Sequence, residues 1–248
     1  MTRTFRALTA LSALGLAGCA TAAPSGPSIT STESLVQAMH DRYAGSWYQT
    51  LSFTQATTRT FPDSTHTEIW REWAAIPGRL RIEMGEPAEG RVAIFARDSA
   101  YSLQHGRVVR RSDRMNPLMT VGFDVYRQAP ERTLDQLRRQ GFDVSRFHRD
   151  TLEGTPVYVI GAERGDTTSK QVAIEAERLL FMRLLDPAPT QPGVMQHIWF
   201  RRYEPLQGGW IAPEVEILVG GRRVFHEVYS DIRANDALDA GMFAIPAG

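Results

Sequence analysis

The sequence predicts a mainly β protein of about 10–12 antiparallel strands, with one helix before the strands and two helices inserted among them. Three observations support this. From Tyr48 onward, apolar and polar side chains alternate in many short runs, as in strands with one buried face. Turn pairs such as His105-Gly106 and Gly220-Gly221 separate the runs. Strands and helices do not alternate regularly, which argues against a parallel sheet.

The first residues have the pattern of a secretory signal. Arg3 and Arg6 precede an apolar run of about ten residues, too short for a membrane span of roughly 20. The motif Leu-Ala-Gly-Cys, which ends at Cys19, resembles the lipobox of bacterial lipoproteins. This resemblance implies that residues 1–18 are a cleaved signal peptide and that Cys19 carries lipid that anchors the protein to a membrane. An ordinary signal peptide with an incidental cysteine is the alternative.

Composition limits the remaining possibilities. The chain has one cysteine, so no internal disulfide is expected. Without residues 1–18, which contain two arginines and no acid, 26 basic residues face 28 acidic ones, a formal charge of 26 − 28 = −2 that gives no indication of nucleic-acid binding. Residues 19–32 have the small, polar composition of a tether, and we expect residues 33–248 to form a single folded domain.

The N-terminal helix is predicted just after the tether. Thr32 is the expected N-cap, because its side chain can accept a hydrogen bond from the first helical turn. Leu35, Met39 and Tyr43 recur every four residues and form one apolar stripe. Gly45 is expected to end the helix.

Strands are predicted over most of the rest of the chain. The Asp63-Ser64 turn also indicates a hairpin after the first strand. The expected runs are 51–58, 79–84, 91–96, 99–104, 107–111, 156–162, 170–176, 179–185, 194–203, 210–219 and 222–232.

Residues 116–140 interrupt the strands with helical character. Asn116 and Pro117 are a typical helix start, with a capping side chain followed by proline at the first position. The first helix is apolar nearly all round, so it must be enclosed on most of its surface. Pro130 begins a second, amphipathic helix that Gly141 is expected to end.

Several short motifs follow one another in an order seen in one known family. They are Phe53-Thr54-Gln55, Trp73 with Pro77, Leu80 with Ile82, Asp98 with Tyr101 and Leu103, Asn116-Pro117-Leu118-Met119, and the final Phe243-Ala244-Ile245-Pro246. Together they resemble the outer-membrane lipoprotein carrier and receptor family (LolA/LolB-like). The resemblance implies an incomplete antiparallel β-barrel, half-closed by a helical lid or plug.

Two features depart from the family's soluble carrier. That carrier has an arginine before the proline that follows the tryptophan, and this arginine helps to hold the lid closed. Here Ile76 occupies the position. The carrier is also free in the periplasm, whereas Cys19 predicts a lipid anchor, as in the receptor.

The resemblance further implies an apolar groove inside the sheet that binds lipid acyl chains through burial of hydrocarbon. The alternative is that the helices fill the interior and leave a solid core. The expected groove residues are Leu51, Phe53, Ile69, Trp73, Leu80, Ile82, Met84, Leu118, Val121 and Val125.

No pattern indicates catalysis, a cofactor or a metal. The six histidines are never spaced as metal ligands, and no nucleophile elbow or phosphate-binding loop is present. The expected function is binding of lipids or lipoproteins for transfer or insertion at the periplasmic face of the outer membrane. The alternative is an envelope lipoprotein that binds another protein on the same fold, without lipid transfer.

Overall fold

The computed structural model describes residues 28–189 and 191–246. Cys19, the expected signal peptide and most of the expected tether lie outside the described residues. No helix in the described ranges is long and apolar enough to cross a membrane.

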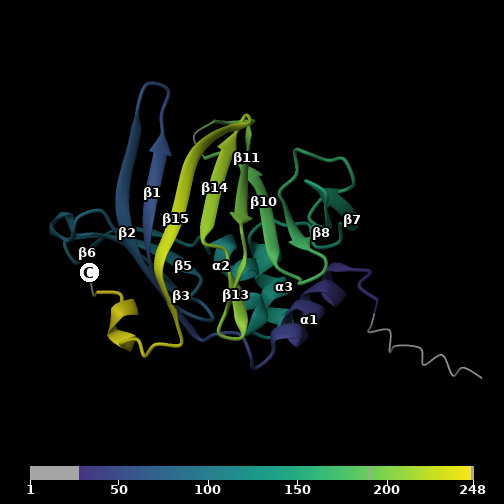
Figure 1. Ribbon diagram of the computed structural model, residues 1–248, viewed down its shortest axis with the longest axis horizontal. Helices are drawn as coiled ribbons and strands as arrows, with labels where there is room; N and C mark the ends of the chain where they lie inside the picture. The colour runs from purple at the N-terminus through teal and green to yellow at the C-terminus, as the bar shows by residue number, and fades with distance from the viewer. Residues whose placement is uncertain (1–27, 190, 247–248) are drawn as a thin grey trace, which may run out of the picture.

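One large antiparallel sheet dominates the structure (Figure 1). It has 13 strands in the order β6-β5-β4-β3-β2-β1-β15-β14-β11-β10-β9-β8-β7. The strands are β1 (Thr50–Thr60), β2 (Thr65–Ala75), β3 (Arg79–Met84), β4 (Arg91–Ala96), β5 (Ser99–Gln104), β6 (Arg107–Ser112), β7 (Phe147–Leu152), β8 (Thr155–Ile160), β9 (Gln171–Glu175), β10 (Phe181–Pro187), β11 (Met195–Arg201), β14 (Glu214–Val219) and β15 (Arg222–Ala234). A separate hairpin contains β12 (Glu204–Leu206) and β13 (Gly209–Ile211).

The mainly β prediction is confirmed, and the sheet is open, with β6 and β7 as its two edges. Its 13 strands slightly exceed the 10–12 expected. One extra strand is β7, whose sequence Phe-His-Arg-Asp-Thr-Leu lacks clear alternation. An edge strand such as β7 pairs on one side only and is weakly marked by its own sequence.

Within residues 28–189 and 191–246, six short helices accompany the sheet. They are α1 (Thr32–Tyr43), η1 (Pro87–Glu89), α2 (Pro117–Gly122), η2 (Asp124–Tyr126), α3 (Pro130–Arg139) and η3 (Ala240–Phe243). The cap of α2 is confirmed, because Asn116 Oδ1 accepts a 3.0 Å hydrogen bond from the Leu118 amide. The predicted N-cap of α1 is wrong by one residue. The Ser31 side chain accepts a hydrogen bond from the Ser34 backbone amide and caps the helix, while Thr32 is already helical and buried.

The core lies between the helices and the face of the sheet that they cover, here called the inner face. Figure 1 shows α2 and α3 behind β14, β11 and β10, with α1 beside α3. The stripe expected on α1 is confirmed, since Leu35, Met39 and Tyr43 are buried. Trp47, just after α1, stacks on Tyr126 of η2 with ring centroids 3.9 Å apart. Aromatic stacking therefore joins the N-terminal helix to the inserted helices.

Candidate functional site

A cavity of about 110 Å³ lies between α2 and the inner face of the sheet. Residues from β1, β2, β3, β11 and β15 form its floor, and α2 with the residue after it forms its roof. The cavity is lined by Leu51, Phe53, Trp70, Glu72, Ala74, Leu80, Ile82, Asn116, Leu118, Met119, Phe123, Phe200, Glu227 and Tyr229.

Half of the expected groove residues lie around this cavity: Leu51, Phe53, Leu80, Ile82 and Leu118. Strand register explains why the first four meet. Side chains two residues apart on a strand share a face, and β2 pairs with both β1 and β3. The interior is therefore neither an open trough nor fully solid, because a small hollow remains beside the packed core.

Three further expected residues lie elsewhere on the inner side. Val121 and Val125 are 2% and 1% exposed and belong to the main core. Met84 shares the face of Ile82 by alternation. It is partly buried and does not line the cavity.

Ile69 and Trp73 need correction, because β2 places them on the outer face. Glu72 of β2 is directly opposite Phe53 of β1, so it faces inward and its neighbour Trp73 faces outward. Ile69 has the same phase as Trp73 and is 42% exposed. The error arose because both faces of β2 carry large apolar residues, and Trp70 is the inward one.

Two carboxyl groups, those of Glu72 and Glu227, line the cavity although neither residue was among the expected groove residues. Glu72 is only 8% exposed. Burial raises the pKa of Glu72 well above its ordinary value, and the neighbouring charge of Glu227 raises it further. Burial likewise raises the pKa of Glu227 to about 7. Only the register of β2 and β15 on either side of β1 brings these residues together.

Polar neighbours hold Glu227 in place. Gln55 Nε2 donates a 3.0 Å hydrogen bond to Glu227 Oε1, and the Tyr229 hydroxyl donates a 3.1 Å bond to Oε2. The Tyr229 ring also stacks on Phe53 at 4.1 Å between centroids. The floor of the cavity therefore combines apolar rings with an ordered acidic group.

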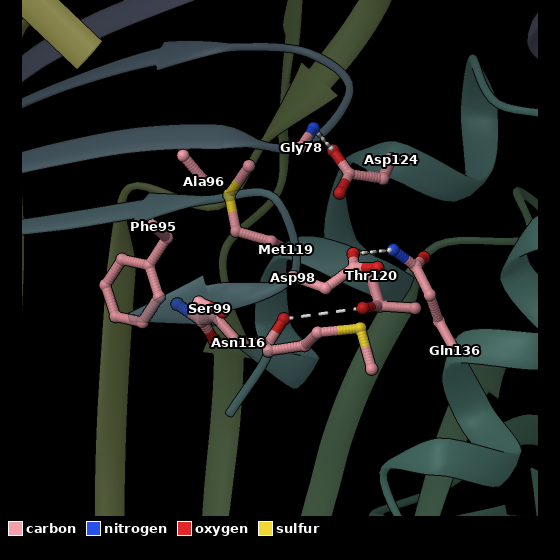
Figure 2. Close-up of a pocket in the computed structure, with 11 residues that line it drawn as sticks. Gly78, Phe95, Ala96, Asp98, Ser99, Asn116, Met119, Thr120, Asp124 and Gln136 are labelled. Atoms are coloured by element: carbon pink, nitrogen blue, oxygen red, sulfur yellow. Dashed lines mark hydrogen bonds between the residues drawn. The ribbon is translucent and has the colours of Figure 1, made fainter. Parts of the chain in front are cut away.

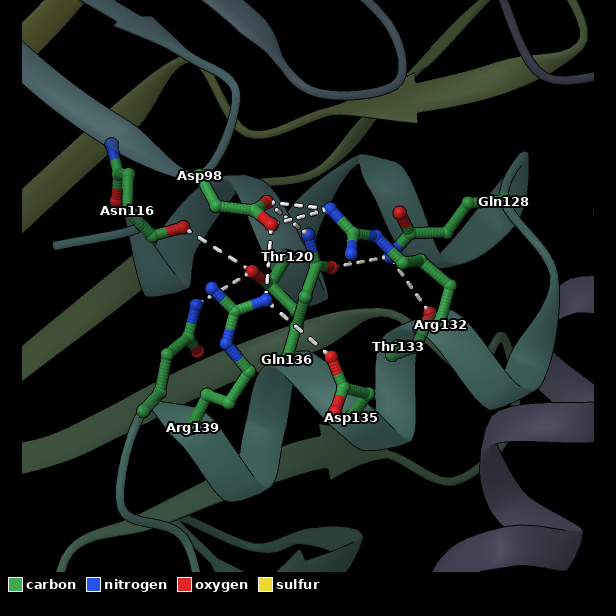
Figure 3. A network of polar contacts seen from close by, with 10 residues as sticks. Asp98, Asn116, Thr120, Gln128, Arg132, Thr133, Asp135, Gln136 and Arg139 are labelled. Carbon is green, nitrogen blue, oxygen red and sulfur yellow. Dashed lines mark hydrogen bonds and ion pairs between the residues drawn. The ribbon is translucent and has the colours of Figure 1, made fainter. Parts of the chain in front are cut away.

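The inserted helices are tied to the sheet by Asp98, in the turn between β4 and β5 (Figure 3). Its carboxylate accepts hydrogen bonds from Arg132 at 2.6 and 2.7 Å, and from Gln136 and Arg139 at 3.1 Å. Burial alone would raise the pKa of Asp98, but the bonds from these side chains and the charge of Arg132 outweigh it and lower the pKa. An aspartate on the sheet thus contacts arginines on α3, while Ile76 is buried in the core.

A second connection joins η2 to the turn between β2 and β3. The buried Asp124 accepts a 3.0 Å hydrogen bond from the Gly78 amide, and Figure 2 shows its carboxylate turned toward that amide. The adjoining cavity measures about 30 Å³, room for about two water molecules. This region attaches the inserted helices to the sheet, and its cavity is too small for an organic ligand.

Removing the Asp98 carboxylate should loosen α3. We expect Asp98→Ala to lower the free energy of unfolding by about 1–3 kcal/mol at pH 7, because three donors lose an ionised, partly buried acceptor. Since the pKa of Asp98 is lowered in the fold, this contribution is present above about pH 4 and is lost as the pH falls through that lowered value. Urea unfolding, with hydrogen exchange of the α3 amides, measures both effects.

Asp135→Ala is the matched control. Asp135 is exposed and lies 3.5 Å from the same Arg139, one helical turn away. An exposed pair of this kind contributes under about 0.5 kcal/mol. Equal destabilisation by the two variants would show that Asp98 does not fasten the helices.

Two other kinds of site, a metal centre and a second ligand pocket, have little support within the described ranges. No group of three or more His, Cys, Asp or Glu residues could hold a metal ion there. A hollow of about 460 Å³ near α3 and β10 has a charged lining that includes Arg114, Arg139 and the ion-paired Lys170 and Asp186. The cavity under α2 is therefore the better candidate for an apolar ligand.

Solved structures of other proteins share the architecture, and three of them illustrate the likeness. A LolA superfamily protein from Nitrosomonas europaea matches with a TM-score of 0.54 and 11% identity, over 87% of this chain and 98% of its own. An outer membrane lipoprotein-sorting protein domain from Vibrio parahaemolyticus matches with a TM-score of 0.57 and 14% identity, over 85% and 95%. A DUF1329 family protein from Desulfovibrio piger matches with a TM-score of 0.55 and 15% identity, over 86% and 95%.

The fold places this protein in the class of proteins that have an open antiparallel sheet with helices packed over its inner face. In particular, the chain has a LolA-like fold, as the sequence resemblance implied. No family model matches the sequence, and no curated protein matches it either. At these identities the likeness concerns the fold.

Proposed function

We propose that this protein binds the hydrocarbon chain of a lipid or lipid-modified protein in the cavity under α2, for lipid or lipoprotein transfer or insertion at the outer membrane. The observation that carries the proposal is an apolar hollow, open between packed helices and sheet, lined by Leu51, Phe53, Leu80, Ile82 and Leu118. Each buried CH₂ group would stabilise the complex by about 0.8 kcal/mol. A hydrocarbon chain needs no hydrogen-bond partner, so binding requires no catalytic machinery.

The size of the cavity limits what enters without rearrangement. Its 110 Å³ compares with about 150 Å³ for an engineered apolar cavity that binds benzene. Full ligand pockets measure about 300–1,000 Å³. A long acyl chain therefore requires α2 to move away from the sheet, and the contacts of Asp98 and Asp124 resist that movement.

Filling the cavity tests the proposal. We expect Ile82→Trp to weaken binding of a fluorescent fatty-acyl probe at least about tenfold, because the indole takes the place of about two methylene groups of ligand. Ile82 is partly buried, directly opposite Glu72. Fluorescence titration of the probe measures the change, and circular dichroism reports whether the sheet is retained.

Ile69→Trp supplies the control, because Ile69 lies on the outer face of the neighbouring strand and is 42% exposed. It should leave probe affinity within about twofold, as surface substitutions are mostly neutral. If both variants bind the probe as the unchanged protein does, the cavity is not the binding site. If the unchanged protein binds no acyl probe, the proposed function is wrong.

We further propose that the protein is held at the periplasmic face of the outer membrane by lipid on Cys19. Support comes from the lipobox-like sequence and from the tether composition of residues 19–32. Membrane fractionation of cells that express the full chain tests this placement, with Cys19→Ala expected in the soluble fraction.

Binding of an envelope protein on the same fold is the second candidate function. Edge strand β6 favours it, since Val109 is 65% exposed there and an edge strand can pair with an added strand. However, Arg107, Arg110 and Arg111 lie on the same strand, and charged residues commonly protect a sheet edge from pairing. The lined cavity therefore favours lipid binding.

A further inference from the structure

The cavity under α2 has an unusual charge pattern for an apolar site. Two carboxyl groups, those of Glu72 and Glu227, face a hollow otherwise lined mainly by apolar side chains. No lysine, arginine or histidine of the described chain lines it. The acidic groups therefore lack a protein cation inside the cavity.

Glu72 is the less satisfied of the two groups. The Glu72 side chain is only 8% exposed. Its carboxyl group has no hydrogen bond or ion pair with any residue that the structure describes. Glu227, by contrast, accepts bonds from Gln55 and Tyr229. A buried charged or polar group without a partner is costly, so the Glu72 carboxyl has capacity for a ligand.

Strand pairing places the two carboxyl groups on the same, inner face of the sheet. β2 and β15 flank β1, where Glu72 is opposite Phe53 and Glu227 is opposite Thr57. Gln55 lies between these two levels on the same face of β1. Both acids are thus held by sheet hydrogen bonding rather than by flexible loops.

Adjacent buried carboxyl groups do not readily ionise together, because the second charge meets both desolvation and repulsion. The raised pKa values of both groups agree with this behaviour. A cation that enters the cavity would favour ionisation of both groups, because its charge offsets the desolvation and repulsion that raise their pKa values. A monovalent cation attached to hydrocarbon is the complementary ligand.

Building on the proposed function, we propose that this cavity selects amphiphiles in which a primary ammonium group is attached to the hydrocarbon chain. The ammonium group has three N–H donors, and the Glu72 carboxyl group, which lines the cavity without a hydrogen-bond partner, can accept from it while the nearby Glu227 adds a favourable charge. A hydroxyl group donates only one hydrogen bond, and a carboxylate or phosphate is repelled by the acidic pair. The apolar walls bind the attached chain, so the head group decides the selectivity.

Three probes of equal chain length test this selectivity: decylamine, decanol and decanoate. Their affinities for the full folded chain are measured by isothermal titration calorimetry at pH 7, below the concentrations at which they aggregate. We expect decylamine to bind at least about tenfold more tightly than decanol, and decanoate to bind most weakly.

Substitution of the acids identifies the cause. Glu72→Gln keeps the shape of the side chain and removes its charge, so it should lower decylamine affinity about tenfold and leave decanol affinity within about twofold. Glu227→Gln provides a second test of the pair. Glu204→Gln is the control, because it removes a glutamate charge from the exposed β12 strand and should change neither affinity. Melting temperatures verify that each variant is folded.

The outcomes separate this inference from the proposed function. Preference for decylamine that disappears in Glu72→Gln or Glu227→Gln, but not in Glu204→Gln, supports the ammonium site. Equal binding of decylamine and decanol, or an amine preference that survives both cavity substitutions, overturns the ammonium site and leaves hydrocarbon binding intact. Failure of all three probes to bind overturns both proposals.

Discussion

Truncation of Tyr126 to alanine should lower the free energy of unfolding by about 3–5 kcal/mol, the range for loss of a buried large aromatic side chain. Tyr126 is 0% exposed. Its ring stacks on Trp47 at 3.9 Å and meets the edge of Tyr43 at 5.1 Å. Its hydroxyl group donates a 3.1 Å hydrogen bond to the Leu179 carbonyl. The variant leaves a cavity where α1, η2 and the sheet meet.

Urea unfolding at pH 7 measures this loss, and Tyr126→Phe is the matched control. The phenylalanine keeps the ring contacts and removes only the hydroxyl group, so we expect a loss of about 1 kcal/mol. If Tyr126→Ala costs no more than Tyr126→Phe, the aromatic cluster does not hold the inserted helices in place. The cluster would then be irrelevant to how α2 covers the cavity.

Asp124→Asn should change how stability depends on pH. Burial raises the pKa of Asp124 from 3.8 to about 7, against the opposing hydrogen bond from the Gly78 amide. The folded state thus holds a proton that the unfolded chain releases near pH 4. The stabilisation is complete below pH 4 and is lost as the pH rises to about 7, by on the order of 4 kcal/mol.

The asparagine variant carries no ionisable group at this position, and its amide oxygen can still accept from the Gly78 amide. We expect the two proteins to have similar stability at pH 4 and the variant to be more stable by up to about 4 kcal/mol at pH 8. Urea unfolding at pH 4, 6 and 8 measures the difference. Other titrating groups, including Glu72 and Glu227, are common to both proteins and cancel. Parallel pH curves for the two proteins would contradict the prediction.

These two residues bear on function because both hold the inserted helices against the sheet. Tyr126 attaches η2 to α1 and to the Leu179 carbonyl, and Asp124 attaches η2 to Gly78. If a long chain enters under α2, these contacts and those of Asp98 set the free energy of opening. Looser attachment above pH 7 would follow from ionisation of Asp124.

Local features of this fold could be predicted well from the sequence. The Asn116-Pro117 start of α2 and the apolar stripe of α1 depend on residues close together in the chain. Alternation along β3 likewise placed Leu80 and Ile82 on one face, and both line the cavity. Such features depend on side-chain periodicity and capping, which tertiary contacts did not override here.

The phase of β2 could not be predicted in the same way. Each face of this strand carries a tryptophan, Trp70 inward and Trp73 outward. A one-residue change of phase exchanges the two faces, so hydrophobicity alone does not choose between them. The pairing of Glu72 with Phe53 on β1 determines which face of β2 points inward. It places a carboxyl group on the inner face, where an apolar residue was expected.

The sequence by itself determined the β-rich composition of the fold, the N-terminal helix, the inserted helices and most strand positions, because these follow from local periodicity, capping and turn residues. Only the tertiary structure decided the open 13-stranded sheet, the acidic pair beside the cavity and the attachment of α3 to Asp98. The reason is that each of these depends on strand order and register between segments far apart in the chain. Those long-range pairings leave no signal in any single stretch of residues.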